Sequence, residues 1–156
     1  MGSKVATKSL GFLYAVTMGG YLGDYKPGDR ANSHISPTLV MNNESLELAL
    51  GAAGGSRIVT AIAQTVKNSI DLELPLNEAV SRGRVYPLED TLLIEAHTGI
   101  NINSVLLDSL KIMDIPFKLQ ETPGFHGRIN AIQYDRSNKR WIGVSDPDWE
   151  GIVLYN

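Results

Sequence analysis

Two adjacent glycines, Gly54 and Gly55, are the residues whose position most clearly suggests chemistry, because they stand between an apolar ribbon and an amphipathic stretch. Glycine lets the backbone adopt left-handed angles and leaves no side chain to block a ligand. We expect Ser56 to cap the helix that follows, so that backbone N–H groups and the positive helix end converge on one point. Such a concavity holds an anion, or a carbonyl oxygen that becomes anionic during acyl transfer.

Two other interpretations of the glycine pair stay open. Adjacent glycines before a helix often form only a tight turn between a strand and that helix. A nucleotide-binding loop is disfavoured, because Ser56 and Arg57 follow Gly55 where a phosphate-binding loop has lysine and then serine or threonine, and the Rossmann glycine spacing is absent.

Ser33 and His34 form a second polar group, at the end of a long loop that leads into a predicted strand. A hydroxyl and an imidazole at the mouth of a strand can bind a substrate carboxylate, and they can equally satisfy backbone groups in an ordinary turn. The other histidines, His97 and His126, share no metal-ligand spacing with His34. We therefore expect no metal site, and no motif predicts a cofactor.

Hydrophobic periodicity predicts the elements that position these groups. Residues 46–50 alternate as a strand, and after the glycines the apolar residues recur at helical spacing. The side chains predicted to face inward from this helix are Ile58, Val59, Ile62, Ala63, Val66 and Ile70. Further strands are predicted over 9–17, 37–41, 91–96, 128–134 and 140–144. A short helix is predicted over 74–80, and a longer one from a cap at Asn101 or Asn103 to residue 114. The side chains predicted to face inward from the longer helix are Val105, Leu106, Leu110 and Met113.

The order of these elements favours an α+β layered domain over a parallel doubly wound sheet, because most strands arrive as hairpins with the helices between them. Residues 1–8 are expected to be a lead-in, either an expression tag or a disordered segment. Residues 9–156 are expected to form a single domain.

Composition excludes several classes of function. The 156 residues are 43% hydrophobic and 20% charged, which is ordinary for a globular domain. The net charge of −3 without a basic cluster argues against nucleic acid as a partner. No apolar stretch is long enough to span a membrane, and the first residues do not resemble a signal peptide, so the localisation stays undecided. The absence of cysteine excludes disulfides and a cysteine nucleophile.

The run Gly54-Gly55-Ser56-Arg57-Ile58, followed by an apolar helix and then Leu76-Asn77-Glu78-Ala79, resembles the gamma-glutamyltranspeptidase family in the C-terminal part of its small subunit. The resemblance extends from about Leu10 to the C-terminus. It implies a layered αββα sandwich of the Ntn-hydrolase type, with this chain supplying the C-terminal part. It also implies a reaction in which a gamma-glutamyl group is transferred or hydrolysed from glutathione-like amides through an acyl-threonine.

The resemblance also implies roles for individual residues. The adjacent N–H groups that form the family's oxyanion hole fall on Gly54 and Gly55, in agreement with the concavity expected there. Two serines that bind the alpha-carboxylate of the glutamyl substrate fall on Ser33 and His34, so the second position departs from the family. Loss of one oxyanion donor in an acyl-transfer enzyme typically lowers turnover by about 10²- to 10³-fold.

Three features of this chain depart from the family pattern. The family's nucleophile is an N-terminal threonine exposed by self-cleavage, and counting back from Gly54 places it upstream of Met1. The acidic or amide segment that binds the substrate's alpha-amino group aligns on residues 15–21, which carry no carboxylate. Asp148 replaces the arginine of a Ser-Asp-Pro-Arg segment, and we expect residues 145–148 to form a structural turn.

The resulting hypothesis is a gamma-glutamyltranspeptidase-like transferase or hydrolase that lacks its nucleophile and is inactive alone. One alternative is a non-catalytic scaffold or a domain that binds a small acid, and another is a relative whose substrate lacks a free alpha-amino group. The expected small-molecule partner is a gamma-glutamyl compound or another small acid. Because strands exposed by a missing half would seek a partner, we also expect the N-terminal part of the enzyme or a second copy of the chain to bind.

Overall fold

The computed structural model describes residues 6–12, 26–28, 33–97 and 103–154, and the chain divides into two compact units, Met1–Ser33 and His34–Asn156. In the first unit, the Thr7 N–H donates a hydrogen bond to the Phe12 carbonyl at 3.0 Å. The strand predicted over 9–17 is wrong for residues 9–12, which form a turn and irregular chain, and its remainder lies outside the described residues. The expected division after residue 8 stays a prediction.

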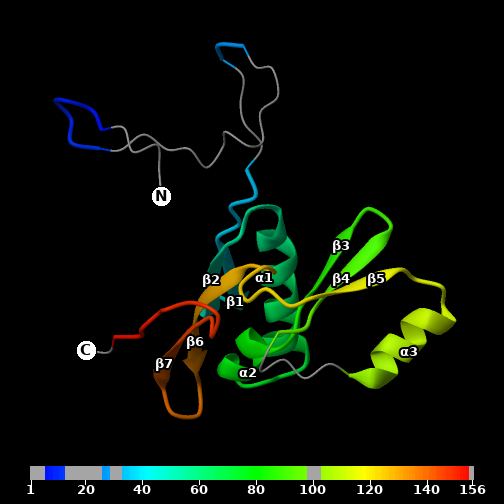
Figure 1. Ribbon diagram of the computed structural model, residues 1–156. Coiled ribbons are helices and arrows are strands. Elements are labelled where there is room, and N and C mark those ends of the chain that lie inside the picture. Colours follow the sequence, from blue (N-terminus) through cyan, green and yellow to red (C-terminus); the bar gives the residue numbers. More distant parts are fainter. Residues whose placement is uncertain (1–5, 13–25, 29–32, 98–102, 155–156) are drawn as a thin grey trace. The chain divides into compact units, whose positions relative to one another are not determined.

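The larger unit contains a four-stranded antiparallel sheet in the order β1-β2-β6-β7 (Figure 1). Its strands are β1 (Thr38–Asn42), β2 (Ser45–Ala53), β6 (Arg128–Asp135) and β7 (Arg140–Ser145). The predicted strands at 37–41, 46–50, 128–134 and 140–144 are confirmed. β2 extends further than its alternation indicates and ends at Ala53, directly before the glycine pair.

A second sheet has three strands, β3 (Val85–Leu88), β4 (Thr91–Glu95) and β5 (Phe117–Gln120). The predicted strand at 91–96 corresponds to β4, whereas β3 and β5 have no counterpart in the sequence prediction. β3 contains Pro87, which weakens a strand pattern but is tolerated here because β3 is an edge strand paired only with β4. β5 pairs in parallel with β4, and α3 (Ser104–Ile112) lies between these strands in the chain.

A continuous helical stretch follows the glycine pair: the 3₁₀ turn η1 (Gly55–Arg57), α1 (Ile58–Val66) and the wider π turn η2 (Lys67–Asp71). The short helix predicted at 74–80 is α2 (Leu76–Ser81). The inward face of α1 differs from the prediction, since Val59 is 48% exposed and Ala63 is also exposed. The buried positions are Ile58, Ala61, Ile62 and Thr65, so a polar threonine and a small alanine take the inward places predicted for Val59 and Ala63.

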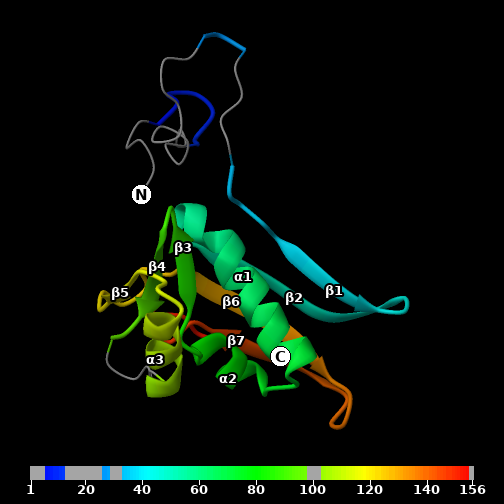
Figure 2. The same cartoon turned by 90° about the vertical axis from the view of Figure 1, so that its right-hand side faces the viewer.

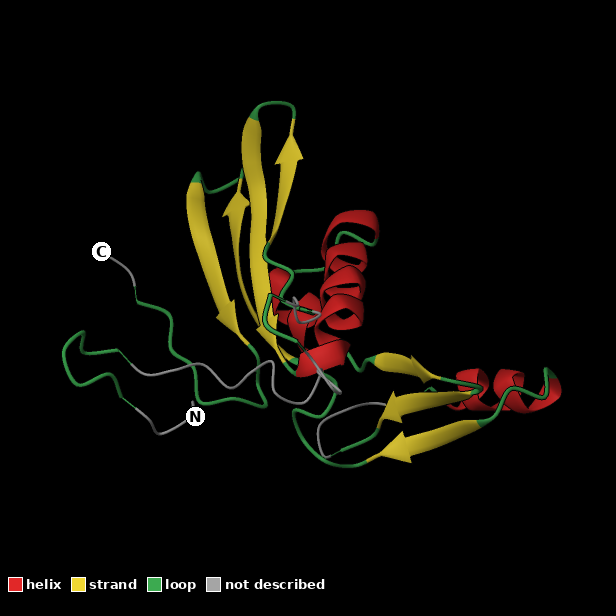
Figure 3. Cartoon of the chain, turned by 90° about the horizontal axis from the view of Figure 1, so that it is seen from above, coloured by secondary structure: helices red, strands yellow, loops and turns green. Residues whose placement is uncertain are grey.

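The core lies between the four-stranded sheet and the helices α1 and α2, which lie along one of its faces (Figures 2 and 3). Its buried residues are Leu48, Leu50, Ile58, Ala61, Ile62, Leu76, Val80, Ile129 and Ala131. Because side chains alternate along a strand, Leu39 and Ile132 point to the other face, where they are 66% and 46% exposed. Among the described residues, no helix covers that face (Figure 3).

α3 begins as predicted at Asn103, whose side chain accepts a hydrogen bond from the Val105 N–H at 2.9 Å. Its predicted inward face is mostly wrong. Leu110 is buried, whereas Val105 and Met113 are 69% and 58% exposed and Leu106 is 40% exposed. No helix in the described part of the chain has the length and apolar character needed to cross a membrane.

Candidate functional site

The glycine pair forms a bend between β2 and η1, with backbone angles that suit glycine. Gly54 has φ of 144° and Gly55 has φ of 64°, a region that residues with a side chain rarely adopt. A Cβ atom at Gly54 would stand 2.7 Å from the Gly127 Cα, closer than real Cβ contacts. Glycine is therefore required at position 54 both by the backbone angle and by the close approach of a second chain segment.

The two amides of this bend belong to adjacent residues at the start of η1. Within the described residues, neither the Gly54 nor the Gly55 N–H donates a hydrogen bond to a main-chain carbonyl in the turns and loops. The Gly55 carbonyl is used, since it accepts the Ile58 N–H at the start of α1. Two adjacent donors at the N-terminal end of a helical stretch can hold an anionic oxygen.

The expected capping role of Ser56 is wrong. The residue before η1 is Gly54 and the residue before α1 is Arg57, and neither makes a side-chain capping hydrogen bond. The Ser56 hydroxyl instead accepts a hydrogen bond from the Tyr86 hydroxyl at 3.2 Å, since Ser56 lies within the 3₁₀ turn and faces β3. Arg57 stacks over the Phe125 ring at 4.1 Å. These contacts fix the turn that follows the glycines.

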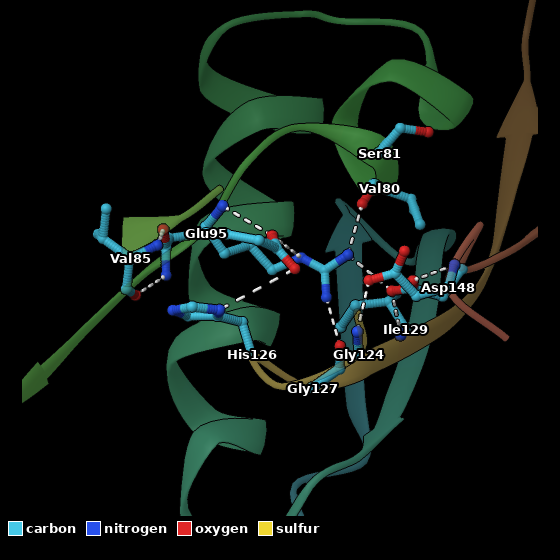
Figure 4. Close-up of polar contacts among 12 residues, drawn as sticks. Val80, Ser81, Val85, Glu95, Gly124, His126, Gly127, Ile129 and Asp148 are labelled. Carbon is cyan, nitrogen blue, oxygen red and sulfur yellow. Dashed lines mark hydrogen bonds and ion pairs between the residues drawn. The ribbon is translucent and has the colours of Figure 1, made fainter. Parts of the chain in front are cut away.

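A buried polar network centred on Arg84 supports the same bend, and Figure 4 labels Val80, Glu95 and Gly127 among its members. The Arg84 guanidinium donates to the Asp146 carboxylate at 2.6 Å, to the Val80 carbonyl at 2.9 Å and to the Gly127 carbonyl. The Arg84 main-chain N–H donates to Glu95 Oε2 at 3.0 Å. Because Gly127 is the residue that packs against Gly54, the guanidinium holds in place the segment on which the glycine bend rests.

Asp146, the carboxylate paired with Arg84, accepts further hydrogen bonds from two main-chain amides. Its Oδ2 accepts the Ile129 N–H at 2.9 Å, and its Oδ1 accepts the Asp148 N–H at 3.1 Å. The turn expected at 145–148 is therefore present, and its carboxylate also joins the β6 strand to Arg84. Sequence reasoning missed this network, although one signal existed: Glu95 is the lone charge in an apolar strand, which is typical of a buried and paired carboxylate.

His126 is fully buried beside this network. Its Nε2 lies 3.2 Å from the Leu93 carbonyl, and its Nδ1 lies 4.0 Å from Glu95 Oε1. Burial lowers the pKa of His126 below its ordinary value of 6.5, and the nearby Arg84 and Arg57 lower it further, against the raising effects of the Leu93 carbonyl and Glu95. The imidazole is therefore neutral at pH 7 and donates from Nε2.

The predicted carboxylate-binding residues precede β1. Thr38 pairs with Leu50 in the antiparallel β1–β2 ladder, so the chain before Thr38 and the chain after Leu50 run toward the same end of the sheet. His34 precedes Thr38 by as many residues as Gly54 follows Leu50. His34 is half-buried, and its carbonyl accepts a hydrogen bond from the Ser36 hydroxyl at 3.1 Å. Ser33 is exposed and ends the first unit.

The roles of Ser33, His34, Gly54 and Gly55 in binding and catalysis stay predictions. The segment at 15–21, where the family's alpha-amino group ligands would align, lies outside the described residues.

The described residues define an α+β protein with a glycine bend at the end of β2, an interior strand of its sheet. The family model for gamma-glutamyltranspeptidase matches residues 1–155. This chain therefore belongs to the gamma-glutamyltranspeptidase family. The resemblance and the fold class derived from the sequence are both confirmed.

Individual relatives agree with this assignment. The glutathione hydrolase proenzyme of Pseudomonas aeruginosa is 33% identical over 132 residues, covering 83% of this chain and 23% of that protein. The proenzyme of Escherichia coli is 39% identical over 80 residues, covering 50% of this chain and 14% of that protein. The chain thus spans less than a quarter of the length of these curated relatives.

A solved structure extends the similarity over the whole fold. The gamma-glutamyltranspeptidase of Pseudomonas nitroreducens, determined in complex with L-DON, superposes with a TM-score of 0.79 at 30% sequence identity. The match covers 99% of this chain and 87% of that chain.

Proposed function

We propose that this chain forms part of an enzyme that transfers or hydrolyses the gamma-glutamyl group of glutathione-like amides. The observation that supports this most directly is the glycine bend, where Gly54 and Gly55 offer two adjacent amides at the end of β2. When a nucleophile attacks the gamma-carbonyl, the carbonyl oxygen becomes negatively charged, and two fixed N–H donors stabilise it more than they stabilise the substrate.

In this proposal, Ser33 and His34 bind the alpha-carboxylate of the donor substrate. The register of β1 with β2 supports a position for His34 at the same end of the sheet as the glycine bend. A hydroxyl donates one hydrogen bond to a carboxylate, and a histidine does so from either ring nitrogen when that nitrogen is protonated. Histidine in place of the family's second serine is expected to alter affinity for the substrate more than the chemical step.

The nucleophile in this proposal is a threonine outside these 156 residues. Its hydroxyl attacks the gamma-carbonyl, its own amino group takes the proton, and the amine of the substrate leaves to give an acyl-threonine ester. Water or an acceptor amine then attacks the ester and releases the glutamyl product. The chain by itself supplies the amide donors and part of the substrate site, and is inactive alone.

The uncovered face of the four-stranded sheet supports a partner for this chain. A groove of about 580 Å³ runs along it between the strands and residues 152–154. Its exposed apolar residues include Leu39, Ile132 and Ile152, which are 66%, 46% and 82% exposed. We propose that the rest of the enzyme covers this face, and that a second copy of the chain does so when the chain is produced alone.

The experiment compares this chain with a protein whose reading frame is extended upstream, using a gamma-glutamyl anilide as substrate. The extended protein is expected to release the aniline steadily, and the chain alone is expected to release none. Steady release by the chain alone would place the nucleophile within it and overturn the proposed division. No release by an extended, self-cleaved protein would instead favour a non-catalytic scaffold that binds a small acid.

A further inference from the structure

We propose that Glu95, His97 and Asp148 form a binding site for zinc or a similar divalent transition-metal ion. Each residue offers one ligand atom, and these three atoms lie within 4.8 Å of one another. The residues come from two places, the end of β4 and the segment after β7, so their spacing in the sequence gives no sign of the cluster. Neither the proposed glutamyl chemistry nor the buried Arg84 network uses His97.

The distances within the cluster suit a small metal ion. His97 Nε2 lies 2.9 Å from Asp148 Oδ2 and 3.4 Å from Glu95 Oε1. Zinc binds histidine nitrogen and carboxylate oxygen at about 2.0–2.2 Å, so two ligands of a tetrahedral site stand about 3.4 Å apart. One imidazole with two carboxylates is a donor set that zinc, manganese and iron(II) accept. A cation can therefore be bound with small side-chain movements.

Buried atoms beside the cluster give an independent reason to expect a ligand. Glu95 Oε1 and His126 Nδ1 are buried, and neither has a hydrogen-bond partner among the described residues. Glu95 and His126 are each 1% exposed, and buried polar atoms in folded proteins are normally hydrogen-bonded. A cation bound to Glu95 Oε1 satisfies this carboxylate oxygen directly.

The ligands are already oriented by other contacts. Glu95 Oε2 accepts the Arg84 N–H at 3.0 Å, which turns Oε1 toward His97. Asp148 Oδ2 accepts the Gly124 N–H at 2.6 Å, which fixes this carboxylate beside the same ring nitrogen, His97 Nε2. Such outer contacts typically change metal affinity by about 10- to 100-fold when removed. The arrangement resembles a preformed metal site more than a flexible group of surface charges.

Two residues of the cluster also border a solvent-filled cleft through which a cation could enter. His97 and Asp148 line a cleft of about 640 Å³, together with Glu121 and Glu150. His97 and Asp148 face this cleft, whereas Glu95 is buried behind them, so a fourth coordination position on the cleft side is open to water, as in zinc sites that exchange ligands. The two additional carboxylates make the cleft attractive to a cation. A bound ion would join β4 to the segment after β7, and so stabilise both sides of the Arg84 network.

Asp148 is the position at which this chain departs from the Ser-Asp-Pro-Arg segment of the family, and the departure replaces a cation by a carboxylate. The site is therefore a property of this chain and does not depend on glutamyl chemistry. Its test needs no enzymatic assay, so its failure is distinguishable from failure of the proposed function.

Isothermal titration calorimetry of ZnCl₂ into the untagged chain at about pH 7.5 tests the proposal. We expect one ion per chain, and a rise in Tm of about 5 °C or more at saturating zinc. X-ray absorption at the zinc edge is expected to show one imidazole and carboxylate oxygens. His97→Ala and Asp148→Asn are expected to weaken binding at least hundredfold, and Asp108→Asn, an exposed carboxylate on α3, is the matched control without effect.

Two outcomes would overturn the proposal. In one, the wild-type chain shows no saturable binding at about 100 μM zinc, and the cluster is then an ion-paired imidazole only. In the other, His97→Ala and Asp148→Asn bind zinc as tightly as the wild type. Circular dichroism of each variant without zinc establishes that it is folded. Should Asp148→Asn fail that check, Asp148→Arg, which carries the residue of the family segment, takes its place.

Discussion

Arg84 Nη2 lies 2.6 Å from Asp146 Oδ2, and both side chains are almost completely buried. This pair connects the end of α2 to the segment after β7, and through the Gly127 carbonyl it reaches the residue that packs against Gly54. A buried ion pair adds little net stability, but removal of one partner leaves the other charge uncompensated. The geometry of the candidate oxyanion site therefore depends on a buried residue pair that lies outside the glycine bend itself.

Asp146→Ala is expected to destabilise the chain strongly. It removes the partner of Arg84 and the acceptor of the Ile129 and Asp148 amides, so the free energy of unfolding should fall by about 3–5 kcal/mol. Urea unfolding measures the change. Asp108→Ala is the matched control, because its pair with Lys111 is exposed and is worth less than about 1 kcal/mol. Equal losses for the two variants would mean that the buried pair does not support the fold.

Gly54→Ala is expected to destabilise the chain by about 2 kcal/mol or more, because its φ is 144° and its Cβ would meet the Gly127 backbone. Gly51→Ala, on the β2 strand that precedes the bend, is the control, since a Cβ there meets nothing within 4 Å. Its effect should stay within about 1 kcal/mol, measured by thermal unfolding. If both substitutions were tolerated alike, the bend would not have the backbone angles described above.

Stability is expected to fall as the pH drops below about 6.5, because of His126. Above that pH the imidazole is neutral in both states and has no effect. Below it the unfolded chain takes up a proton first, since burial lowers the pKa in the folded chain, and the loss is complete once the pH lies below that lowered pKa.

His126→Gln keeps a donor for the Leu93 carbonyl and removes this titration. Urea unfolding at about pH 7.5 and about pH 5 should show a smaller loss of stability on acidification for the variant than for the wild type. Asp135 does not interfere, because hydrogen bonds from Asn138 lower its pKa below the ordinary value of 3.8. An identical pH dependence in both proteins would contradict a neutral, buried His126.

Ser33→Ala is expected to raise KM for a gamma-glutamyl anilide by about 10- to 100-fold in the upstream-extended protein, because a hydrogen bond to a charged group is worth about 1.5–3 kcal/mol. His34→Ser, which installs the family's second serine, should lower KM. Ser45→Ala, an exposed serine at the start of β2, is the control. A change in kcat with KM unaltered would argue against carboxylate binding by Ser33.

The chain alone is expected to form a homodimer or a larger assembly through the uncovered sheet face. Ile132→Asp should shift it toward monomer in light scattering, because it introduces a charge into the apolar groove. Val59→Asp is the matched control, since Val59 is 48% exposed on the outer face of α1 and Ile132 is 46% exposed. A wild-type chain that remains monomeric at high concentration would exclude this interface.

The sequence was sufficient for the elements whose patterns are local. The alternation at 46–50, the Asn103 cap and the final hairpin each depend on neighbouring residues, and all three are confirmed. β3 was missed because Pro87 obscures an edge strand, and the faces of α1 and α3 were misplaced because burial depends on what each helix packs against.

In the candidate site, too, only the features that depend on neighbouring residues were predictable from the sequence. The glycine bend was predictable, because two adjacent glycines between a strand and a helix restrict the backbone locally. Arg84 and Asp146 are separated by 62 residues, so nothing in their spacing indicates that they meet. Glu95, His97 and Asp148 likewise converge only through the packing of β4 against the segment after β7.

The most direct test of the central claim is a crystal structure of the upstream-extended protein with a gamma-glutamyl ligand trapped on its threonine. We expect the acyl oxygen to lie about 2.7–3.1 Å from both the Gly54 and the Gly55 nitrogen. A structure in which these amides diverge, or bond to the chain's own carbonyls while the acyl oxygen is held elsewhere, would contradict the assignment.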